Sequence, residues 1–141
     1  MPVRLKRVYE GPSRADGPRI LVERLWPRGL TKDQAAIDFW LKPLAPSTEL
    51  RKWFHARPSM WREFRRRYLA ELRGPAASAA LQQLYDLVHS SRNVTLVFAA
   101  RNTEHNSATV LKELLEGMRK PPGSSGPMKT AAAPARARAK R

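Results

Sequence analysis

The chain has 141 residues, of which 42% are hydrophobic and 28% are charged, and it contains no cysteine. This length suits one domain with its own core, and the lack of cysteine excludes disulfides, thiolate metal sites and thiol catalysis. No stretch reaches the roughly 18 uncharged apolar residues of a membrane span, and the N-terminus lacks the apolar region of a signal peptide, so we expect a cytoplasmic protein without membrane partners.

Basic residues are in large excess: 27 Lys and Arg against 12 Asp and Glu give a formal net charge of +15. Residues 121–141 are rich in Pro, Gly, Ser and Ala without apolar periodicity, which predicts a disordered basic tail after a domain at 1–120. Such a chain attracts polyanions, and nucleic acid is a candidate partner of the tail; the alternative is that arginine serves only as a solvated residue. The tail's basic residues are Lys129, Arg136, Arg138, Lys140 and Arg141.

The first third of the chain predicts two strands. Residues 3–9 alternate apolar and basic side chains, which is typical of a strand with one solvated face. Residues 20–22 form a short apolar run between turn signals, which favours a central strand covered on both sides. Residues 36–46 contain two aromatic residues and two prolines, and we expect an extended, packed connection rather than a helix.

Three helices are predicted in the middle of the chain. Ser47 is a suitable N-cap for a short helix through Phe54, residues 58–73 form a longer one, and Gly74-Pro75 separates it from a third that ends near His89. At helical spacing, the aromatic residues are expected to face the core and the arginines to form an exposed stripe that can touch phosphates. These residues are Trp53, Phe54, Trp61, Phe64 and Tyr68, and Arg51, Arg62, Arg65, Arg66 and Arg67.

The strongest strand signal is residues 94–99, which are apolar, uncharged and rich in β-branched side chains, as in a central parallel strand. A polar loop at 101–107 leads into a last amphipathic helix. Strands that alternate with amphipathic helices predict an α/β fold: a single compact domain with a mostly parallel sheet flanked by helices.

Two strand exits hold the candidate binding residues. In open α/β sheets, ligands bind beyond the carboxyl ends of the strands. Arginine binds two oxygens of a phosphate or carboxylate at once, and the free N–H groups at a helix start also attract anions. We therefore predict a small-anion site with residues from both exits. They are Arg24, Trp26, Arg28, Gly29 and Lys32 after the first strand, and Asn102 and Asn106 after the last.

The residues of the first exit also have structural alternatives. Arg24 is placed to form an ion pair with Glu23 or Asp38 at the sheet edge. Trp26 suits packing better than ligand stacking, and Gly29 can serve only to provide a positive φ in the Pro-Arg-Gly turn.

The second exit offers little chemistry beyond anion binding. Asn102 or Thr103 is a candidate cap of the last helix. His105 is separated from His55 and His89 by predicted helices, so we expect no metal site, and we expect no cofactor. The chain has no phosphate-binding glycine loop and no nucleophile-elbow serine, and we assign no reaction.

Several blocks resemble the YeaO-like bacterial branch of the family of domain of unknown function 488. They are Lys6-Arg7-Val8-Tyr9, Asp16-Gly17, Ile20-Leu21-Val22-Glu23-Arg24-Leu25-Trp26-Pro27-Arg28-Gly29, Ala45-Pro46-Ser47-Thr48-Glu49-Leu50-Arg51, Trp53-Phe54-His55 and Thr95-Leu96-Val97, with Phe64, Tyr68, Asn102 and Asn106. The resemblance covers about residues 3–118 and implies a compact α/β domain without an assigned activity.

Two departures limit what the resemblance implies. Other branches carry a cysteine in the loop after the last strong strand, whereas residues 101–106 here contain none. No thiol-dependent role is therefore transferred. The branch usually has aspartate at the position of Glu23, so the charge is retained on a longer side chain.

Three functions fit the sequence. The first is binding of a small phosphate- or carboxylate-bearing ligand between the two strand exits. The second is a structural or interaction domain in which Trp26-Pro27-Arg28-Gly29 is a folding device. The third is a nucleic-acid-binding accessory protein without sequence preference, for which positive charge is the argument.

Overall fold

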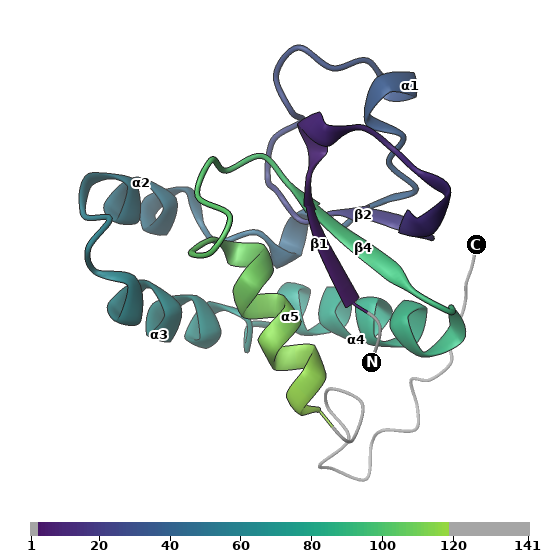
Figure 1. Cartoon of the computed structure of the whole chain (residues 1–141). Coiled ribbons are helices and arrows are strands. Elements are labelled where there is room, and N and C mark those ends of the chain that lie inside the picture. Colours follow the sequence, from purple (N-terminus) through teal and green to yellow (C-terminus); the bar gives the residue numbers. More distant parts are fainter. Residues whose placement is uncertain (1–2, 119–141) are drawn as a thin grey trace, which may run out of the picture.

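A parallel sheet lies at the centre of the computed structural model, which describes residues 3–118 (Figure 1). Within these residues the strand order is β1-β4-β2-β3, and every pairing is parallel. The predicted α/β class and parallel sheet are confirmed, whereas the predicted tail at 121–141 lies outside the described residues. The strands are Val3–Arg7 (β1), Arg19–Leu21 (β2), Phe39–Trp40 (β3) and Val94–Phe98 (β4).

Strand β4 is the centre of the sheet, because it pairs with β1 on one side and β2 on the other. Val3 lies opposite Val94, and Ile20 lies opposite Leu96. All five residues of β4 are buried. The run at 94–99 is therefore a central parallel strand, as its uncharged β-branched composition predicts.

The predicted helices form close to their expected ends. Ser47 caps α2 by accepting a hydrogen bond from the Leu50 amide, 3.1 Å away, through its hydroxyl oxygen. The helix expected from residue 58 begins three residues later, and a four-residue helix (α1) that we did not predict follows the cap Thr31. The helices are Lys32–Ala35 (α1), Thr48–Ala56 (α2), Trp61–Glu71 (α3), Pro75–Ser90 (α4) and Ser107–Gly117 (α5).

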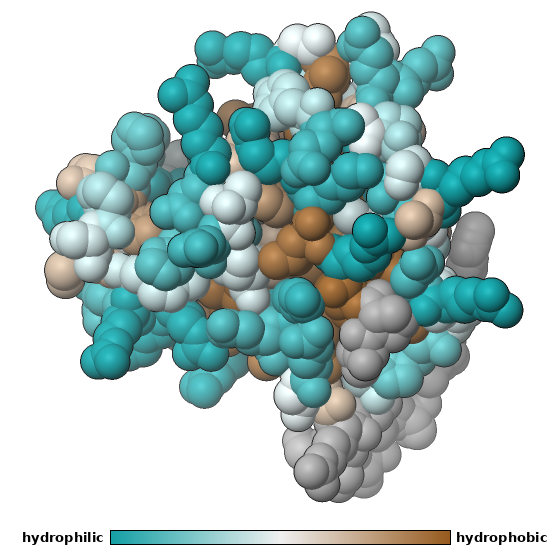
Figure 2. Space-filling view, viewed as in Figure 1, coloured by the Kyte–Doolittle hydropathy of each residue, from teal (hydrophilic) through white to brown (hydrophobic). Residues whose placement is uncertain are grey.

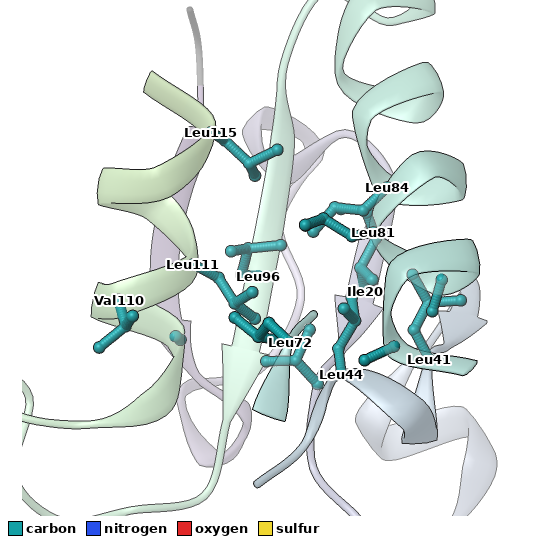
Figure 3. Packing of buried hydrophobic residues seen from close by; sticks show 14 of the residues in the cluster. Ile20, Leu41, Leu44, Leu72, Leu81, Leu84, Leu96, Val110, Leu111 and Leu115 are labelled. Carbon is teal, nitrogen blue, oxygen red and sulfur yellow. The ribbon is translucent and has the colours of Figure 1, made fainter. Parts of the chain in front are cut away.

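The helices cover the two faces of the sheet unequally (Figure 1). Helices α2 to α5 lie on one side, where a large apolar core includes residues of the sheet and of all four helices. In Figure 3, Leu111 and Leu115 of α5 approach Leu96 of β4 from one direction, and Leu81 and Leu84 of α4 approach from another. This layer accounts for most of the buried apolar surface, the main favourable contribution to folding.

The opposite face carries a smaller core around Leu21, Val97 and Ala35. The connection at 36–46 is extended only in part: its residues Phe39–Trp40 pair with β2 as a short edge strand, whereas Lys42–Leu44 form one turn of 3-10 helix, which we did not predict. Two residues are too few to show a strand pattern in the sequence. This strand therefore forms because it pairs with β2.

A buried ion pair joins the segment before β2 to the sheet. Asp16 is 1% exposed and Arg19 is 2% exposed, and Arg19 Nη1 lies 2.7 Å from Asp16 Oδ2. Lys6 Nζ lies 3.2 Å from the same carboxylate. Arg19 also donates through Nε and Nη2 to the carbonyl oxygen of Ala35. The pair thus connects β1, β2 and α1.

Candidate anion-binding groove

Arg24 points from the end of β2 towards the segment before α2. Its Nε donates to the carbonyl oxygen of Pro46 at 3.4 Å, and its Nη2 donates to that of Ala45 at 3.2 Å. The expected alternative, an ion pair with Glu23 or Asp38, is wrong. Within residues 3–118 Arg24 forms no ion pair, and Asp38 accepts from the Arg19 amide instead.

Trp26 packs on the other side of the sheet. Its ring meets that of Trp40 edge-on, with centroids 5.5 Å apart, and its Nε1 donates to the carbonyl oxygen of Leu30 at 2.8 Å. The expectation that Trp26 packs in the protein is confirmed, because its ring contacts Trp40 and its indole N–H is already bonded to Leu30.

The remaining predicted residues of the first exit lie in the loop that leads to α1. The Arg28 carbonyl oxygen accepts a hydrogen bond of 2.9 Å from the Tyr9 hydroxyl, and the Arg28 side chain is exposed. Gly29 has φ +83°, as the turn requires, and Lys32 is the exposed first residue of α1.

The two asparagines of the second exit organise their own loop. Asn102 Oδ1 accepts from the backbone amides two and three residues further on, each at 2.9 Å. Asn106 is the N-cap of α5, where its Oδ1 accepts from the Thr109 amide at 3.0 Å. The expectation that Asn102 or Thr103 caps this helix is therefore wrong, because the helix begins further along the chain.

A groove of about 440 Å³ lies beyond the carboxyl ends of β2 and β3. Arg24 lines it, and none of the other six predicted site residues does. Its remaining walls come from the segment after β3 and from the junction between α3 and α4. The lining residues are Arg24, Lys42, Pro43, Ala45, Ser47, Glu71, Leu72, Gly74, Pro75, Ala76 and Ala77.

Two cations of the groove are held in place by neutral partners. Arg24 uses its hydrogen bonds on backbone carbonyls, so its charge is not neutralised there. Lys42 Nζ lies 4.2 Å from the centroid of the Trp40 ring. A cation over an indole face is stabilised but keeps its full charge. Both side chains are thus oriented and still available to an anion.

The start of α4 adds uncharged donors to the same groove. Gly74 is the N-cap and Pro75 the first helical residue, and the first helical bond runs from the Ser78 amide to the Gly74 carbonyl at 2.8 Å. The amides of Ala76 and Ala77 therefore have no acceptor within the helix. The positive end of the helix dipole lies here, in a helix of 16 residues.

One acid lies among these donors and is already engaged. Glu71 accepts from the Ser47 amide at 2.8 Å and from the Ser47 hydroxyl at 2.6 Å, which ties the end of α3 to the start of α2. Two cations and a helix start thus outweigh one carboxylate, and the groove is positive.

Glu23 is a half-buried acid at the end of β2, where its Oε2 accepts from the Ala99 amide at 2.9 Å. Burial raises the pKa of this carboxyl above 4.5, and the Ala99 N–H and the charge of Arg51 counteract part of that rise. The hydrogen bond joins the ends of β2 and β4 next to the groove.

The raised pKa of Glu23 predicts a pH dependence of stability. Above pH 4.5 the unfolded chain releases this proton before the folded protein does, so the free energy of unfolding falls as the pH rises. The variant Glu23→Gln keeps an acceptor for Ala99 and cannot ionise. Urea unfolding should therefore show this variant gaining stability relative to the natural protein between pH 4.5 and neutral pH. A stability difference between the two proteins that does not change over this pH range would contradict the assignment.

Sequence reasoning missed Lys42 and the start of α4 as parts of the site. Lys42 follows a two-residue strand that has no pattern of its own. Gly74-Pro75 was interpreted as the end of one helix, although proline is favoured at the first position of a helix and also marks a start. That signal could have suggested the anion-binding amides at 76 and 77.

We searched the part of the chain that the structure describes for a metal site and for a membrane-spanning helix and found neither. Residues 3–118 contain no group of three His, Cys, Asp or Glu side chains able to hold a metal ion. No helix in the same range is long and apolar enough to cross a membrane.

Fold and groove together define a small α/β protein with a parallel sheet and a cationic groove beyond the carboxyl ends of two strands. The family described as the inactive DUF488-N3 subclade matches residues 2–128, and the chain belongs to this family. It is 42% identical over 118 residues to the uncharacterized protein YeaO of Escherichia coli, which covers 84% of this chain and all of the relative. It is 44% identical over 116 residues to an uncharacterized protein of Mycobacterium tuberculosis, covering 82% of this chain and 94% of the relative. No solved structure gives a significant match.

Proposed function

We propose that the protein binds a small phosphate- or carboxylate-bearing molecule in the groove between β2, β3 and the start of α4. The observation that carries this proposal is that Arg24, Lys42 and the first turn of α4, with Ala76 and Ala77, line one groove. Guanidinium, ammonium and helix N-terminal N–H groups are the donors that proteins use for these anions.

The size of the groove supports a small molecule. Its volume of about 440 Å³ lies within the range of about 300–1,000 Å³ typical of metabolite sites. Leu72, Pro43 and Pro75 supply apolar wall, so an anionic group on a short organic body matches the lining.

Binding without catalysis is the form of the proposal that the residues favour. The groove holds no cysteine or histidine, and Glu71 is occupied by Ser47. Membership of the inactive DUF488-N3 subclade is consistent with binding without a reaction. The prediction that Arg28, Lys32, Asn102 and Asn106 share a ligand remains a separate proposal.

Titration calorimetry with inorganic phosphate and, separately, with succinate tests the site. Loss of a charged hydrogen bond costs about 1.5–3 kcal/mol, so Arg24→Gln should weaken binding at least about tenfold. Lys42→Met should also weaken binding, and it leaves the contacts of Arg24 with residues 45 and 46 intact.

Arg14→Gln is the matched control, since it removes one exposed arginine that does not line the groove. It should leave the affinity unchanged. Thermal unfolding of each variant separates lost binding from lost structure. Equal weakening by Arg24→Gln and Arg14→Gln, or unchanged affinity in both Arg24→Gln and Lys42→Met, would contradict the proposed groove.

A further inference from the structure

A second groove, of about 560 Å³, is lined by residues of α3 and of the turn that follows it, and it shares no lining residue with the first groove. Its lining residues recur at intervals of three and four, so they share one face of the helix. Four of the six are arginines. The lining consists of Arg62, Arg65, Arg66, Leu69, Ala70 and Arg73, which we call the α3 arginine face.

The charge of this face is only partly neutralised. Arg65 lies 3.1 Å from Glu113 of α5, and Arg66 pairs with Glu63 on α3 itself. The Arg65 side chain is partly exposed and that of Arg66 is largely exposed, and exposed pairs of this kind contribute only about 0–1 kcal/mol, so a stronger anion can replace the carboxylates. Within residues 3–118, Arg62 and Arg73 form no ion pair.

Apolar and aromatic groups are scarce on the α3 arginine face. Leu69 and Ala70 are its apolar residues, and no aromatic ring lines it. Figure 2 shows a mostly hydrophilic surface over α3, with the clearest apolar area between β1 and α5 instead. The face therefore lacks the apolar surface that inserts into a membrane and the rings on which unpaired bases stack.

We propose that the α3 arginine face binds the phosphate backbone of a nucleic-acid duplex. The helical part of the face, from Arg62 to Ala70, is about 12 Å long, because each residue adds about 1.5 Å, and Arg73 lies in the turn after α3. One strand of a duplex carries a phosphate about every 3.4 Å of its axis, so this length faces about three or four phosphates. Guanidinium groups at regular spacing along a rigid helix complement such a row of negative charges, because each can bind a phosphate through two N–H groups.

Contacts of this type position a protein on a duplex without reading its sequence. Because phosphate contacts carry no sequence information, we expect equal affinity for duplexes of different sequence. The face is separate from Arg24 and Lys42, and its function does not depend on the small-anion groove.

Fluorescence anisotropy with a labelled DNA duplex of about 20 base pairs tests the proposal on the full chain at several salt concentrations. Arg62→Gln combined with Arg73→Gln removes the two arginines of this face that form no ion pair within residues 3–118. The double variant should bind about tenfold more weakly at low salt, and the slope of log affinity against log salt should flatten by about 2 because two phosphate contacts are lost.

Arg14→Gln combined with Arg92→Gln is the matched control: it removes the same charge from exposed positions before β2 and β4. Affinity and salt slope should then stay close to those of the natural protein. Equal losses in both double variants would show that net charge alone attracts the duplex and would overturn the proposal, as would unchanged binding by the first. Tighter binding to single-stranded oligothymidine, or equally strong competition by poly-glutamate, would also overturn it.

Discussion

Replacing Asp16 with alanine should lower the free energy of unfolding by about 3–5 kcal/mol, because it leaves the guanidinium of Arg19 buried without its counter-charge. Both side chains are almost completely buried and lie 2.7 Å apart. Urea unfolding at neutral pH measures the change. Lys6→Met is the comparison: Lys6 touches the same carboxylate but is 20% exposed, so its loss should cost only about 1 kcal/mol. Equal costs for the two variants would contradict a dominant role of the buried pair.

The same ion pair predicts loss of stability in acid. Burial alone would raise the pKa of Asp16, but hydrogen bonds from Arg19, Ser13 and Lys6 outweigh it and lower the pKa from 3.8 to about 2. The stabilisation is therefore complete above pH 3.8 and declines as the pH falls towards 2. It amounts to about 2 kcal/mol, which the Asp16→Ala variant should not lose in this range because it has no carboxyl to protonate.

Gly17→Ala should be nearly as destabilising, by about 2–5 kcal/mol, for two separate reasons. Gly17 has φ +62° and ψ −155°, a backbone region that is essentially restricted to glycine. A Cβ at this position would lie 2.3 Å from the carbonyl oxygen of Asn93, so the backbone before β4 would have to move. Strain and overpacking each cost about 1–3 kcal/mol.

Gly11→Ala separates these two causes. Gly11 has a similar conformation, with φ +82° and ψ 159°, but a Cβ there would meet nothing within 4 Å. Its cost should be the strain alone, about 1–3 kcal/mol. Thermal and urea unfolding give the free energy of unfolding of both variants. The extra cost of Gly17→Ala over Gly11→Ala is the cost of the close approach between a Cβ at position 17 and Asn93. If both substitutions cost the same, the close approach has no energetic consequence.

Asp16 and Gly17 form the corner of the chain that aligns β2 with β4. The Asp16 carbonyl oxygen accepts a hydrogen bond of 2.7 Å from the Thr95 hydroxyl, and the Thr95 amide donates to the Pro18 carbonyl at 2.9 Å. Arg19 then lies opposite Thr95 in the sheet. Because the register is set at this end of β2, the corner determines where Arg24 emerges at the other end.

Beyond the ends of β2 and β3 the chain carries two basic side chains, Arg24 and Lys42, that line one groove. The proposed small-anion groove and the α3 arginine face both need positive charge held in a defined place, and neither needs a reactive side chain. Their tests are independent, since Arg24 and Arg62 lie in different grooves.

Local signals in the sequence determined most of the fold. The central strand at 94–98, the cap Ser47 and the positive φ of Gly29 follow from composition, side-chain chemistry and turn type over a few neighbouring residues. The same reasoning located one end of the site, because Arg24 follows an apolar strand. Short elements escaped it: α1 and β3 have four and two residues, too few for a periodic pattern.

Only the tertiary structure decided which residues share a groove. The sequence by itself placed Arg24 at a strand exit and Gly74-Pro75 at a helix boundary, some fifty residues apart. They meet because β3 pairs with β2, which carries Lys42 to the same sheet edge, and because α3 returns the chain to that edge before α4 begins. Such contacts depend on strand order and on the packing of helices against the sheet. Neither is encoded in the neighbours of Arg24, which is why the sequence indicated an anion-binding edge and the structure identified its other donors.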